Sequence, residues 1–522
     1  MKINFFLDGW HFLKKDSCEF HYKGSFSYRG EIVSPELIFS EINKLGSDVF
    51  KYISGFFSFI FYDKRKKFIL AAVDLIRSIP LFFSKINDEL NIYSDTLKIS
   101  KRNQRDAISE DIFRLCGYTI GRDTLYENIK QLVAGSYIKV SNSEWREVTY
   151  FKFTARNQQE KFSKENFFSE LDKSLITSFE KMLKLYSGRQ LIVPLSGGYD
   201  SRLIISMLKH LNYENVVCFT YGKKNNLESK YSENIARSLG YQWIFIEYSD
   251  DKWKKAWKSK IAKDYVGYSS NDSSLPHIQD WLAVKEMKER KLIEDNAVFV
   301  PGHCCVTSYI NKDILSFKGD FEKKFIDNTI SLHFNNIPLG ETKNIEDISK
   351  LTQLIKDRGM KDSNLKNNLV GNIIEYNWRE RQSKYITNSL RVYDFFGYDW
   401  WIPLWDKNFV EKWIFIPNDL RVDRFLFKEY VSLKYNSIEG AFIIYDNAIK
   451  KSKIKQILTR ILGENIIKNL LLVRRYFPRN PYKHHYLYFG SILNNDEIIK
   501  MNHKGYSIIG MFSKKYLDNT WN

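Results

Sequence analysis

The sequence predicts an α/β protein in two halves, a β-rich first part and a later part built on a parallel sheet. Up to about residue 150, short apolar segments such as FFSFIFYD and FILAAVD are separated by charged turns, which is typical of a mostly antiparallel β domain. From residue 190 onward, strand-like and helix-like segments alternate, which indicates parallel strands joined by helical crossovers. At 522 residues the chain exceeds one ordinary core, so two or three domains are expected.

Strands and helices alternate regularly enough in the second half for its first elements to be assigned in sequence order. Leu191–Leu195 and Asn215–Gly222 are the first two expected strands, and Lys224–Tyr248 repeats a helix and a third strand. In an open α/β sheet, ligands bind at the carboxyl ends of the strands. Ser196 and Tyr221 should therefore lie at the same edge of the sheet.

The turn after the first of these strands is the most informative stretch of the chain. It reads Ser196, Gly197, Gly198, Tyr199, Asp200 and Ser201, and an apolar helical pattern follows. The two glycines let the backbone come close to a ligand, and the first amides of the helix add the positive end of its dipole. Such a turn binds phosphates. The plainer alternative is a helix start in which Ser196 or Asp200 is only a cap.

This turn resembles the SGGxDS loop of the PP-loop ATP pyrophosphatases. It differs from the Walker loop, which needs a lysine directly before its final hydroxyl residue. The resemblance implies ATP and Mg²⁺ as cofactors, with the loop on the β and γ phosphates and Asp200 on the metal ion. The expected nucleotide-binding residues are Leu195, Ser196, Gly197, Gly198, Asp200, Ser201, Tyr221 and Gly302.

The first half resembles the glutamine amidotransferase domain of asparagine synthetases, an Ntn-type fold. The similarity lies in GFFSFIFYD, in VDLIRSIPLFF and in TLYENIKQLVAGSYIKV. Active members use the amino group and thiol of an N-terminal cysteine, whereas this sequence begins Met1-Lys2 and its nearest cysteine is Cys18. Arg29-Gly30-Glu31 stands where the family has Asn-Gly-Glu. We therefore expect this domain to be a scaffold without glutaminase activity.

A second departure from the asparagine synthetase pattern follows the strand at Asn296. The family's Gly-Glu-Gly-Ser-Asp-Glu loop over the pyrophosphate corresponds to Gly302–Thr307, with His303 at the glutamate and Val306 at the aspartate. His303 could act as a base for an incoming amine, because its unperturbed pKa lies near neutrality. His277 and Asp280 are further candidates for active-site residues. Their segment resembles one in synthetase-like proteins that are encoded with bacterial surface-polysaccharide genes. A lone histidine at a helix start is, however, more often structural.

The C-terminal third carries the remaining candidates. Pro403–Asp406 matches the family's Pro-Leu-x-Asp element, and Leu420–Val431 resembles the helix with Lys-x-x-Leu-Arg, with Lys428 as its lysine. Lys450 or Lys451 lies at the distance of a second lysine that stabilises charge on the α-phosphate. Three cations share one helix and could face either phosphate or solvent. They are Arg379, Arg381 and Lys384.

Composition limits the partners. The formal charge of +18 suits an acidic substrate or RNA, but the basic residues are spread along the chain, so nucleic acid is not favoured. Five scattered cysteines indicate neither a disulfide framework nor a zinc site. The N-terminal segment does not resemble a signal peptide and no apolar segment has the length of a membrane span, so a reducing cytoplasm is the expected location.

Taken together, these features predict a carbon–nitrogen ligase of the asparagine synthase type. The expected domains are 1–155, resembling an inactive amidotransferase, then 160–455, the PP-loop domain, and 456–522, a basic aromatic extension. The resemblance implies that ATP activates a carboxylate as an acyl-adenylate, which ammonia or an amine captures. Aspartate and the acidic sugars of surface glycans are candidate acids, and a homodimer is compatible with the sequence. The alternatives are a non-catalytic ATP-binding homologue and a PP-loop RNA-modifying enzyme.

Overall fold

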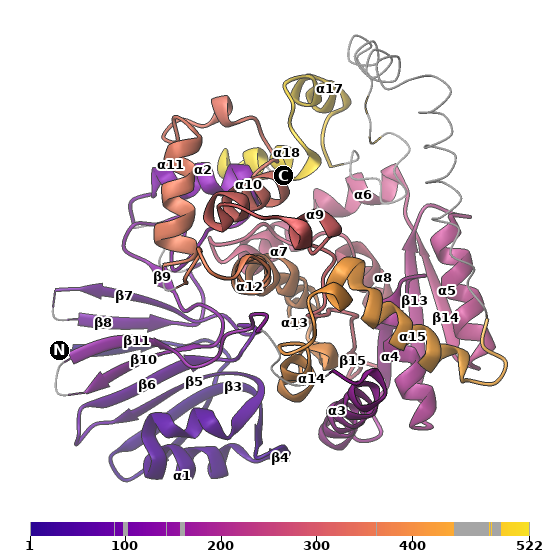
Figure 1. The fold of residues 1–522 in the computed structure, drawn as a ribbon, viewed down its shortest axis with the longest axis horizontal. Coiled ribbons are helices and arrows are strands. Elements are labelled where there is room, and N and C mark those ends of the chain that lie inside the picture. The colour runs from indigo at the N-terminus through magenta and orange to yellow at the C-terminus, as the bar shows by residue number, and fades with distance from the viewer. Residues whose placement is uncertain are drawn as a thin grey trace.

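The computed structural model describes residues 2–87, 89–97, 103–141, 144–156, 162–361, 363–442, 480, 482 and 492–520. It confirms the predicted class, with antiparallel sheets first and a parallel sheet later (Figure 1). None of the helices in this part of the chain is long and apolar enough to cross a bilayer.

Two sheets form the first half. One has the order β1-β8-β7-β9, and the other has the order β11-β10-β6-β5-β3-β2, with β4 beside β3. The pairing is antiparallel except between β1 and β8. The strands are β1 (Lys2–Phe6), β2 (His11–Lys15), β3 (Cys18–Tyr28), β4 (Glu31–Val33), β5 (Ile53–Asp63), β6 (Phe68–Val73), β7 (Phe82–Ile86), β8 (Glu89–Tyr93), β9 (Lys130–Gln131), β10 (Ser136–Ser141) and β11 (Glu144–Thr149).

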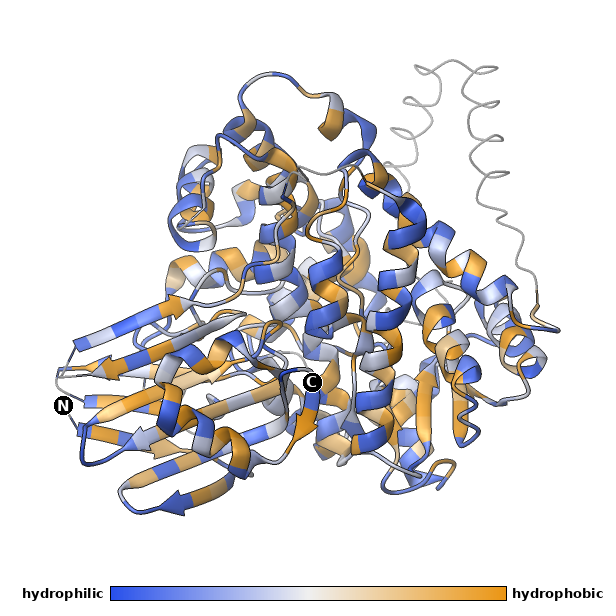
Figure 2. Cartoon of the chain, turned by 60° about the horizontal axis from the view of Figure 1, so that its bottom comes forward, coloured by the Kyte–Doolittle hydropathy of each residue, from blue (hydrophilic) through white to orange (hydrophobic). Residues whose placement is uncertain are grey.

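Apolar side chains on both faces of the larger sheet explain why these strands stack. Ile60 and Ile138 pack toward the smaller sheet, and Phe20 and Phe59 pack toward helix α1 (Pro35–Leu45) on the opposite face. Apolar segments accordingly run along several of the strands, while the turns at their ends are mostly hydrophilic (Figure 2). Helix α2 (Ala107–Cys116) completes this half.

The second half is a five-stranded parallel sheet of order β14-β13-β12-β15-β16, surrounded by helices (Figure 1). Its strands are β12 (Leu191–Pro194), β13 (Val216–Gly222), β14 (Gln242–Glu247), β15 (Val298–Phe299) and β16 (Asp399–Trp400). Its helices up to residue 316 are α3 (Lys164–Leu185), α4 (Tyr199–His210), α5 (Leu227–Ser238), α6 (Asp250–Trp257), α7 (Lys260–Ser270), α8 (Trp281–Glu289) and α9 (Lys312–Ser316).

Helices dominate the rest of the described chain. They are α10 (Phe321–His333), α11 (Ile348–Leu354), α12 (Leu369–Tyr376), α13 (Leu390–Phe396), α14 (Lys407–Lys412), α15 (Phe425–Asn436), α17 (Asn495–His503) and α18 (Ile508–Leu517), with π-helical segments η4 (Ile355–Gly359) and η5 (Asn377–Ile386). Short 3₁₀ segments are η1 (Gly46–Lys51), η3 (Leu339–Glu341), η6 (Thr387–Ser389), η7 (Pro403–Trp405) and η8 (Asp419–Arg424). The end of the described chain returns to the core, since the Tyr516 hydroxyl donates to Ser270 over 2.8 Å.

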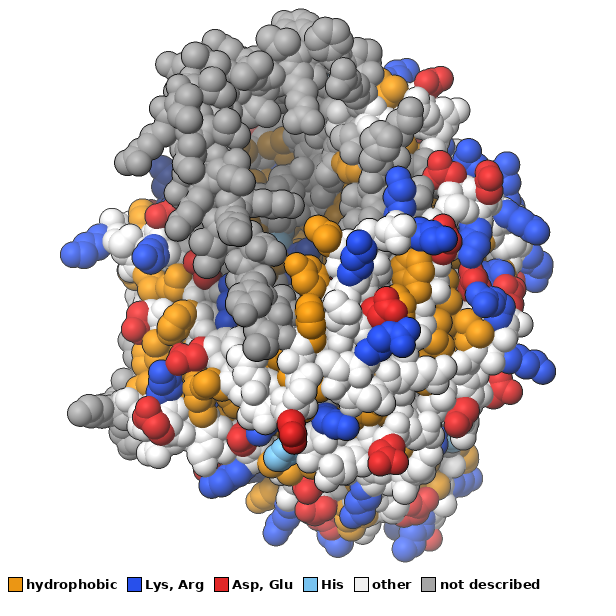
Figure 3. Space-filling view, turned by 90° about the vertical axis from the view of Figure 1, so that its right-hand side faces the viewer, with side chains coloured by type: hydrophobic (Ala, Val, Ile, Leu, Met, Phe, Trp, Pro, Cys, Tyr) orange, Lys and Arg blue, Asp and Glu red, His pale blue; other side chains and the backbone are white. Residues whose placement is uncertain are grey.

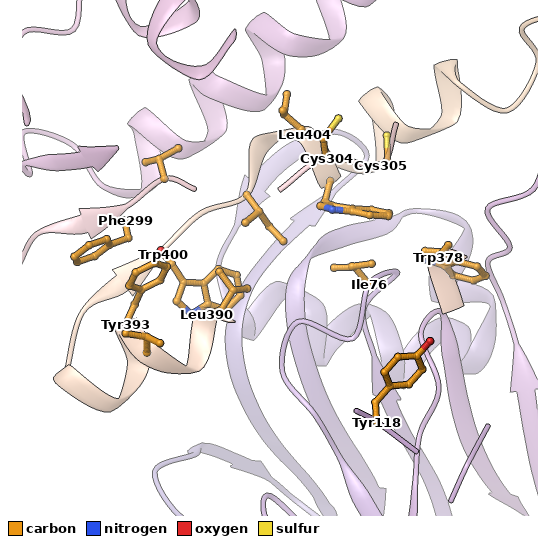
Figure 4. Packing of buried hydrophobic residues seen from close by; sticks show 14 of the residues in the cluster. Ile76, Tyr118, Phe299, Cys304, Cys305, Trp378, Leu390, Tyr393, Trp400 and Leu404 are labelled. Carbon is orange, nitrogen blue, oxygen red and sulfur yellow. The ribbon is translucent and has the colours of Figure 1, made fainter. Parts of the chain in front are cut away.

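One hydrophobic core runs through both halves of the molecule. Ile76 and Tyr118 from the first half belong to the same cluster as Phe299 and Trp378 from the second (Figure 4). Phe299 stacks on Tyr393 with ring centres 4.2 Å apart. The halves therefore do not meet across a solvated interface.

Segment η5 also joins the halves through buried charge. Lys384 Nζ donates to Glu380 over 2.6 Å and to the carbonyl oxygens of Thr119 and Gly121, and the Gly121 amide donates to the same carboxylate over 2.9 Å. Neither charged side chain is exposed to solvent. Arg379 is buried as well. Of the helix's three cations, Lys384 thus faces the junction of the halves, while Arg379 donates to the Gly359 carbonyl oxygen within the second half, and neither is exposed to solvent.

Candidate functional site

The loop from β12 to α4 is closed by its two serines. Ser201 Oγ lies 3.0 Å from Ser196 Oγ and accepts the Ser196 amide, while Ser196 Oγ accepts the Gly198 amide over 3.1 Å. Leu195 is buried, and its amide donates to Phe219 of β13. Gly198 begins the helix without a side-chain cap, so the plainer alternative of a capping serine or aspartate does not describe this helix start.

The sheet order places this loop at the point where the chain changes direction. From the central β12 the chain builds β13 and β14 on one side and β15 and β16 on the other. The carboxyl ends of β12 and β15 therefore border the crevice in which ligands of open α/β sheets bind. This crevice is the predicted site.

Gly302, which follows β15, touches the loop across this crevice. A methyl group on Gly302 would lie 2.9 Å from the Ser201 nitrogen and 3.1 Å from Asp200 Cβ, so a larger residue would push the two segments apart. Tyr221 ends β13 on the other side of β12 and stacks on Tyr248 with ring centres 5.1 Å apart. The predicted binding residues are thus brought together around the end of β12.

Arg424 is the functional candidate that the sequence analysis missed. Its guanidinium makes a bidentate ion pair with the Asp200 carboxylate, one hydrogen bond being 3.1 Å long. Asp423 and Arg424 both have left-handed backbones, with φ of 50° and 62°. This conformation costs roughly 1–2 kcal/mol per residue outside glycine, and strain of this kind clusters at functional sites.

A signal for Arg424 was present in the sequence. If the Lys-x-x-Leu-Arg pattern is set four residues earlier than in the sequence analysis, Arg424 takes the place of its lysine and Lys428 that of its arginine. Lys428 lies one turn further along α15, with Nζ 5.9 Å from the centre of the Tyr199 ring. It faces the start of α4 rather than the Asp200 carboxylate. The other two predicted lysines, Lys450 and Lys451, lie outside the described residues.

His303 occupies the crevice beside Gly302. Its Nε2 lies 2.8 Å from Ser389 Oγ, while its Nδ1 is buried and has no hydrogen-bond partner among the described residues. Burial lowers the pKa of His303 to about 4, with a smaller contribution from His277, while Asp280 opposes the shift. At physiological pH the ring is therefore neutral, but it is a weaker base than the near-neutral pKa expected from the sequence would make it.

His277 and Asp280 form a separate pair next to His303. His277 Nε2 lies 2.9 Å from the Asp280 carboxylate, which also accepts the Tyr393 hydroxyl over 2.8 Å. Burial would raise the pKa of Asp280, but the charge and hydrogen bond of His277 outweigh it and hold the pKa below its usual value. The close contact between the His277 ring and the Asp280 carboxylate thus lies beside His303.

We expect His303 not to titrate between pH 8 and 5.5. The folded protein keeps the ring neutral down to about pH 4, whereas the unfolded chain protonates it near pH 6.5. His303 therefore weakens folding as the pH falls through this interval. NMR of ¹³C-labelled histidine, with His303→Gln to assign the resonance, measures the pKa. A midpoint near 6.5 for this resonance would contradict the enclosed position of the ring.

The residues at the loop fit a nucleotide with its metal ion. The described residues contain no group of three or more His, Cys, Asp or Glu side chains placed to hold a metal. Mg²⁺ bound with a nucleotide needs few protein side chains, because phosphates and water supply most of its ligands. The single carboxylate of Asp200 at an uncapped, glycine-lined helix start is compatible with such binding.

The first half offers no exposed thiol in its described residues. Cys18 lies on β3, buried between the sheet and α1, and its burial raises the pKa of the thiol, with the charge of Asp63 adding to the shift. Arg29 and Gly30 form a two-residue hairpin turn, both with positive φ, between β3 and β4. Arg29 packs on the Tyr52 ring, 4.9 Å away, and has no amide side chain with which to grip glutamine.

Comparison with known protein families gives one match in each half of the chain. The family described as "Glutamine amidotransferase domain" matches residues 29–151, and the family described as "Asparagine synthase" matches residues 171–279. The chain is thus similar to a glutamine amidotransferase domain in its first half and to asparagine synthase in part of its second half. The matched ranges include the amidotransferase-like segments and the Ser196–Ser201 loop, whereas Gly302–Thr307, Pro403–Asp406 and Leu420–Val431 lie outside them.

Among curated relatives, this chain is similar to "Putative asparagine synthetase [glutamine-hydrolyzing] 2" of Methanocaldococcus jannaschii. The two are 24% identical over 207 residues, which is 38% of this chain and 39% of that protein. The similarity thus spans well under half of the relative's length.

Solved structures with some likeness include two enzymes from other organisms. The U34-tRNA thiolase of Methanococcus maripaludis is 14% identical, with 62% of this chain and 86% of that chain covered and a TM-score of 0.22. The NH3-dependent NAD synthetase of Campylobacter jejuni is 13% identical, with 42% and 95% covered and a TM-score of 0.22.

Proposed function

We propose that this chain is an ATP-dependent carbon–nitrogen ligase that forms AMP. The carboxylate of an acid attacks the α-phosphate of ATP and gives an acyl-adenylate and pyrophosphate. Ammonia or an amine then attacks the acyl carbon, and AMP leaves as the amide forms. The observation that carries the proposal is the glycine-lined loop at the chain reversal of the parallel sheet, with Asp200 and Arg424 paired at its mouth.

The loop supplies the phosphate contacts in this proposal. The amides of Gly197 and Gly198 and the hydroxyls of Ser196 and Ser201 would hold the β and γ phosphates at the positive end of α4. Gly302 lets the opposite wall approach, and Leu195 and Tyr221 would border the nucleotide. Asp200 would take Mg²⁺.

Arg424 and Lys428 bring positive charge to the same place. Once Asp200 turns to the metal ion, the guanidinium of Arg424 is released and can stabilise the charge that develops on the phosphates. Lys428, and one of Lys450 and Lys451, would add to this electrostatic stabilisation. Holding the acid and ATP together while excluding water limits hydrolysis of the adenylate.

The nitrogen would come from free ammonia or an amine. Cys18 is buried, and we propose that residues 1–155 serve as scaffold to the domain of residues 160–455. His303 is neutral and would take the proton that the attacking amine loses. A reducing cytoplasm would suit five free, buried cysteines.

Pyrophosphate exchange against a panel of carboxylates tests the proposal directly. With the right acid, labelled pyrophosphate enters ATP, and this exchange is lost in Asp200→Ala. The panel should include aspartate and acidic sugars. If no acid supports exchange, or if exchange proceeds equally well in Asp200→Ala, the ligase assignment is wrong.

A non-catalytic ATP-binding protein is the second candidate. It is favoured by the loss of both carboxylates from the Gly302–Thr307 loop, where His303 and Val306 now stand. Saturable ATP binding without exchange for any acid would support it. RNA modification is less well supported, since acidic and basic side chains are interspersed over the visible surface in Figure 3.

A further inference from the structure

A small cavity lies behind the Asp200–Arg424 ion pair. Its polar lining comes from Arg421, Arg424, Thr307 and Cys305, and aromatic and aliphatic side chains such as Trp413 form the rest of its wall. Arg424 lines the cavity and also contacts the loop. Its terminal nitrogens bind the Asp200 carboxylate, and its Nε is buried without a hydrogen-bond partner. The cavity is therefore next to the nucleotide site but separate from it.

Arg421 is a buried cation for which the described residues supply no carboxylate partner. Its side chain donates to the carbonyl oxygens of Ile414 and Ile416 over 2.9 and 3.0 Å, and its Nε is buried without a hydrogen bond. The residue is 7% exposed. An uncompensated charge in such a position is strongly destabilising, so proteins pair it with an opposite charge.

The cavity itself offers no such charge. Neither Asp nor Glu lines it. Cys305 could supply a thiolate, but burial and the neighbouring Cys304 raise its pKa well above its usual value, so the thiol stays protonated. Two guanidinium Nε–H groups therefore share the cavity wall with apolar side chains and a neutral thiol. An anion bound in the cavity would supply the charge that its described lining lacks.

We propose that the cavity between Arg421 and Arg424 is a binding site for one small monovalent anion, of halide or carboxylate size. Its free volume of about 20 Å³ admits a group little larger than water and excludes a whole sugar or nucleotide. An anion here balances the charge of Arg421. It also gives Arg424 a second partner when Asp200 turns to a metal ion. The binding itself does not require the proposed ligase activity.

Thermal unfolding of the full chain in different sodium salts tests the site. At equal ionic strength, chloride, bromide or acetate should raise the midpoint of wild type over that in gluconate, by roughly 2 °C or more. The effect should saturate with salt concentration. Arg421→Met should lose this response, and Arg421→Lys, which keeps the charge, should retain part of it.

Arg391→Met is the matched control. Arg391 is also buried, but it pairs with Asp394 at 2.8 Å, so its loss should lower stability equally in every salt and leave the anion response intact. If Arg421→Met responds to chloride, bromide and acetate as wild type does, the proposal is overturned.

Crystals grown in bromide provide a test that does not depend on a variant folding. Anomalous scattering should place a bromide ion within hydrogen-bonding distance of Arg421 Nε, and its absence from the cavity at high bromide concentration would refute the site. Competition by acetate then separates the two sources of anion. Displacement of bromide assigns a site for a carboxylate group, while bromide that resists acetate assigns a halide site.

Discussion

Replacing Arg424 by methionine is expected to slow pyrophosphate exchange by about 10²–10³-fold, the cost of removing one preorganised electrostatic contact from an active site. Methionine keeps the length of the side chain but removes the charge and both hydrogen bonds to Asp200. The loss should fall on the rate at saturating ATP rather than on ATP affinity, since the charge that Arg424 meets grows during phosphoryl transfer. Exchange assays over a range of ATP concentrations separate the two.

Arg424→Lys and Lys428→Met are the informative companions of this variant. A lysine at position 424 keeps one charge but cannot bind bidentately, so an intermediate rate is expected. Lys428 lies over the Tyr199 ring and does not contact Asp200, so its loss should cost less than that of Arg424. A larger loss in Lys428→Met than in Arg424→Met would assign the main catalytic cation to Lys428, as the sequence pattern predicted.

Replacing Glu380 by glutamine should lower the free energy of unfolding by about 3–5 kcal/mol, the cost of breaking a buried ion pair by removing one partner. The change leaves the ammonium of Lys384 without its counter-charge at a position that solvent does not reach. Arg379 is buried nearby and adds to the excess of positive charge. Urea unfolding followed by circular dichroism measures the loss. Because one core spans both halves, both should unfold earlier.

Glu289→Gln is the control for this prediction. Glu289 pairs with Lys285 on the surface of α8 at 2.6 Å, and exposed pairs of this type contribute less than about 1 kcal/mol. The double variant Glu380→Leu/Lys384→Met should regain part of the stability lost in Glu380→Gln, because no buried charge is then left alone. Equal stability of Glu380→Gln and Glu289→Gln would show that the buried pair does not hold the halves together.

Local patterns in the sequence were sufficient for the fold class and for the strand, loop and helix around Ser196–Ser201. Alternating strands and helices around this loop specify a parallel sheet. Gly302 was expected beside the loop because its segment resembles the family's pyrophosphate loop, and in the structure it lies next to Asp200 and Ser201. Each of these inferences uses residues that are close together in the chain.

Features that depend on distant contacts were beyond such reasoning. Arg424 reaches Asp200 from 224 positions away, through two left-handed residues that no periodicity predicts. The spacing of Arg379 and Lys384 places them near one another on a helix but does not reveal that the carbonyl oxygens of Thr119 and Gly121 accept hydrogen bonds from Lys384. The depressed pKa of His303 likewise comes from burial by segments remote in sequence.

The buried pair in η5 gives the first half a structural role that does not depend on any catalysis there. The Gly121 amide and the carbonyl oxygens of Thr119 and Gly121 satisfy Glu380 and Lys384, which the second half cannot satisfy with its own backbone at that place. A gene shortened to the second half would encode a chain whose hydrophobic core is exposed where the first half had packed. The charges of Glu380 and Lys384 would lie at this exposed surface. If the first half lost its chemical role, selection would still retain it, because the second half needs it in order to fold.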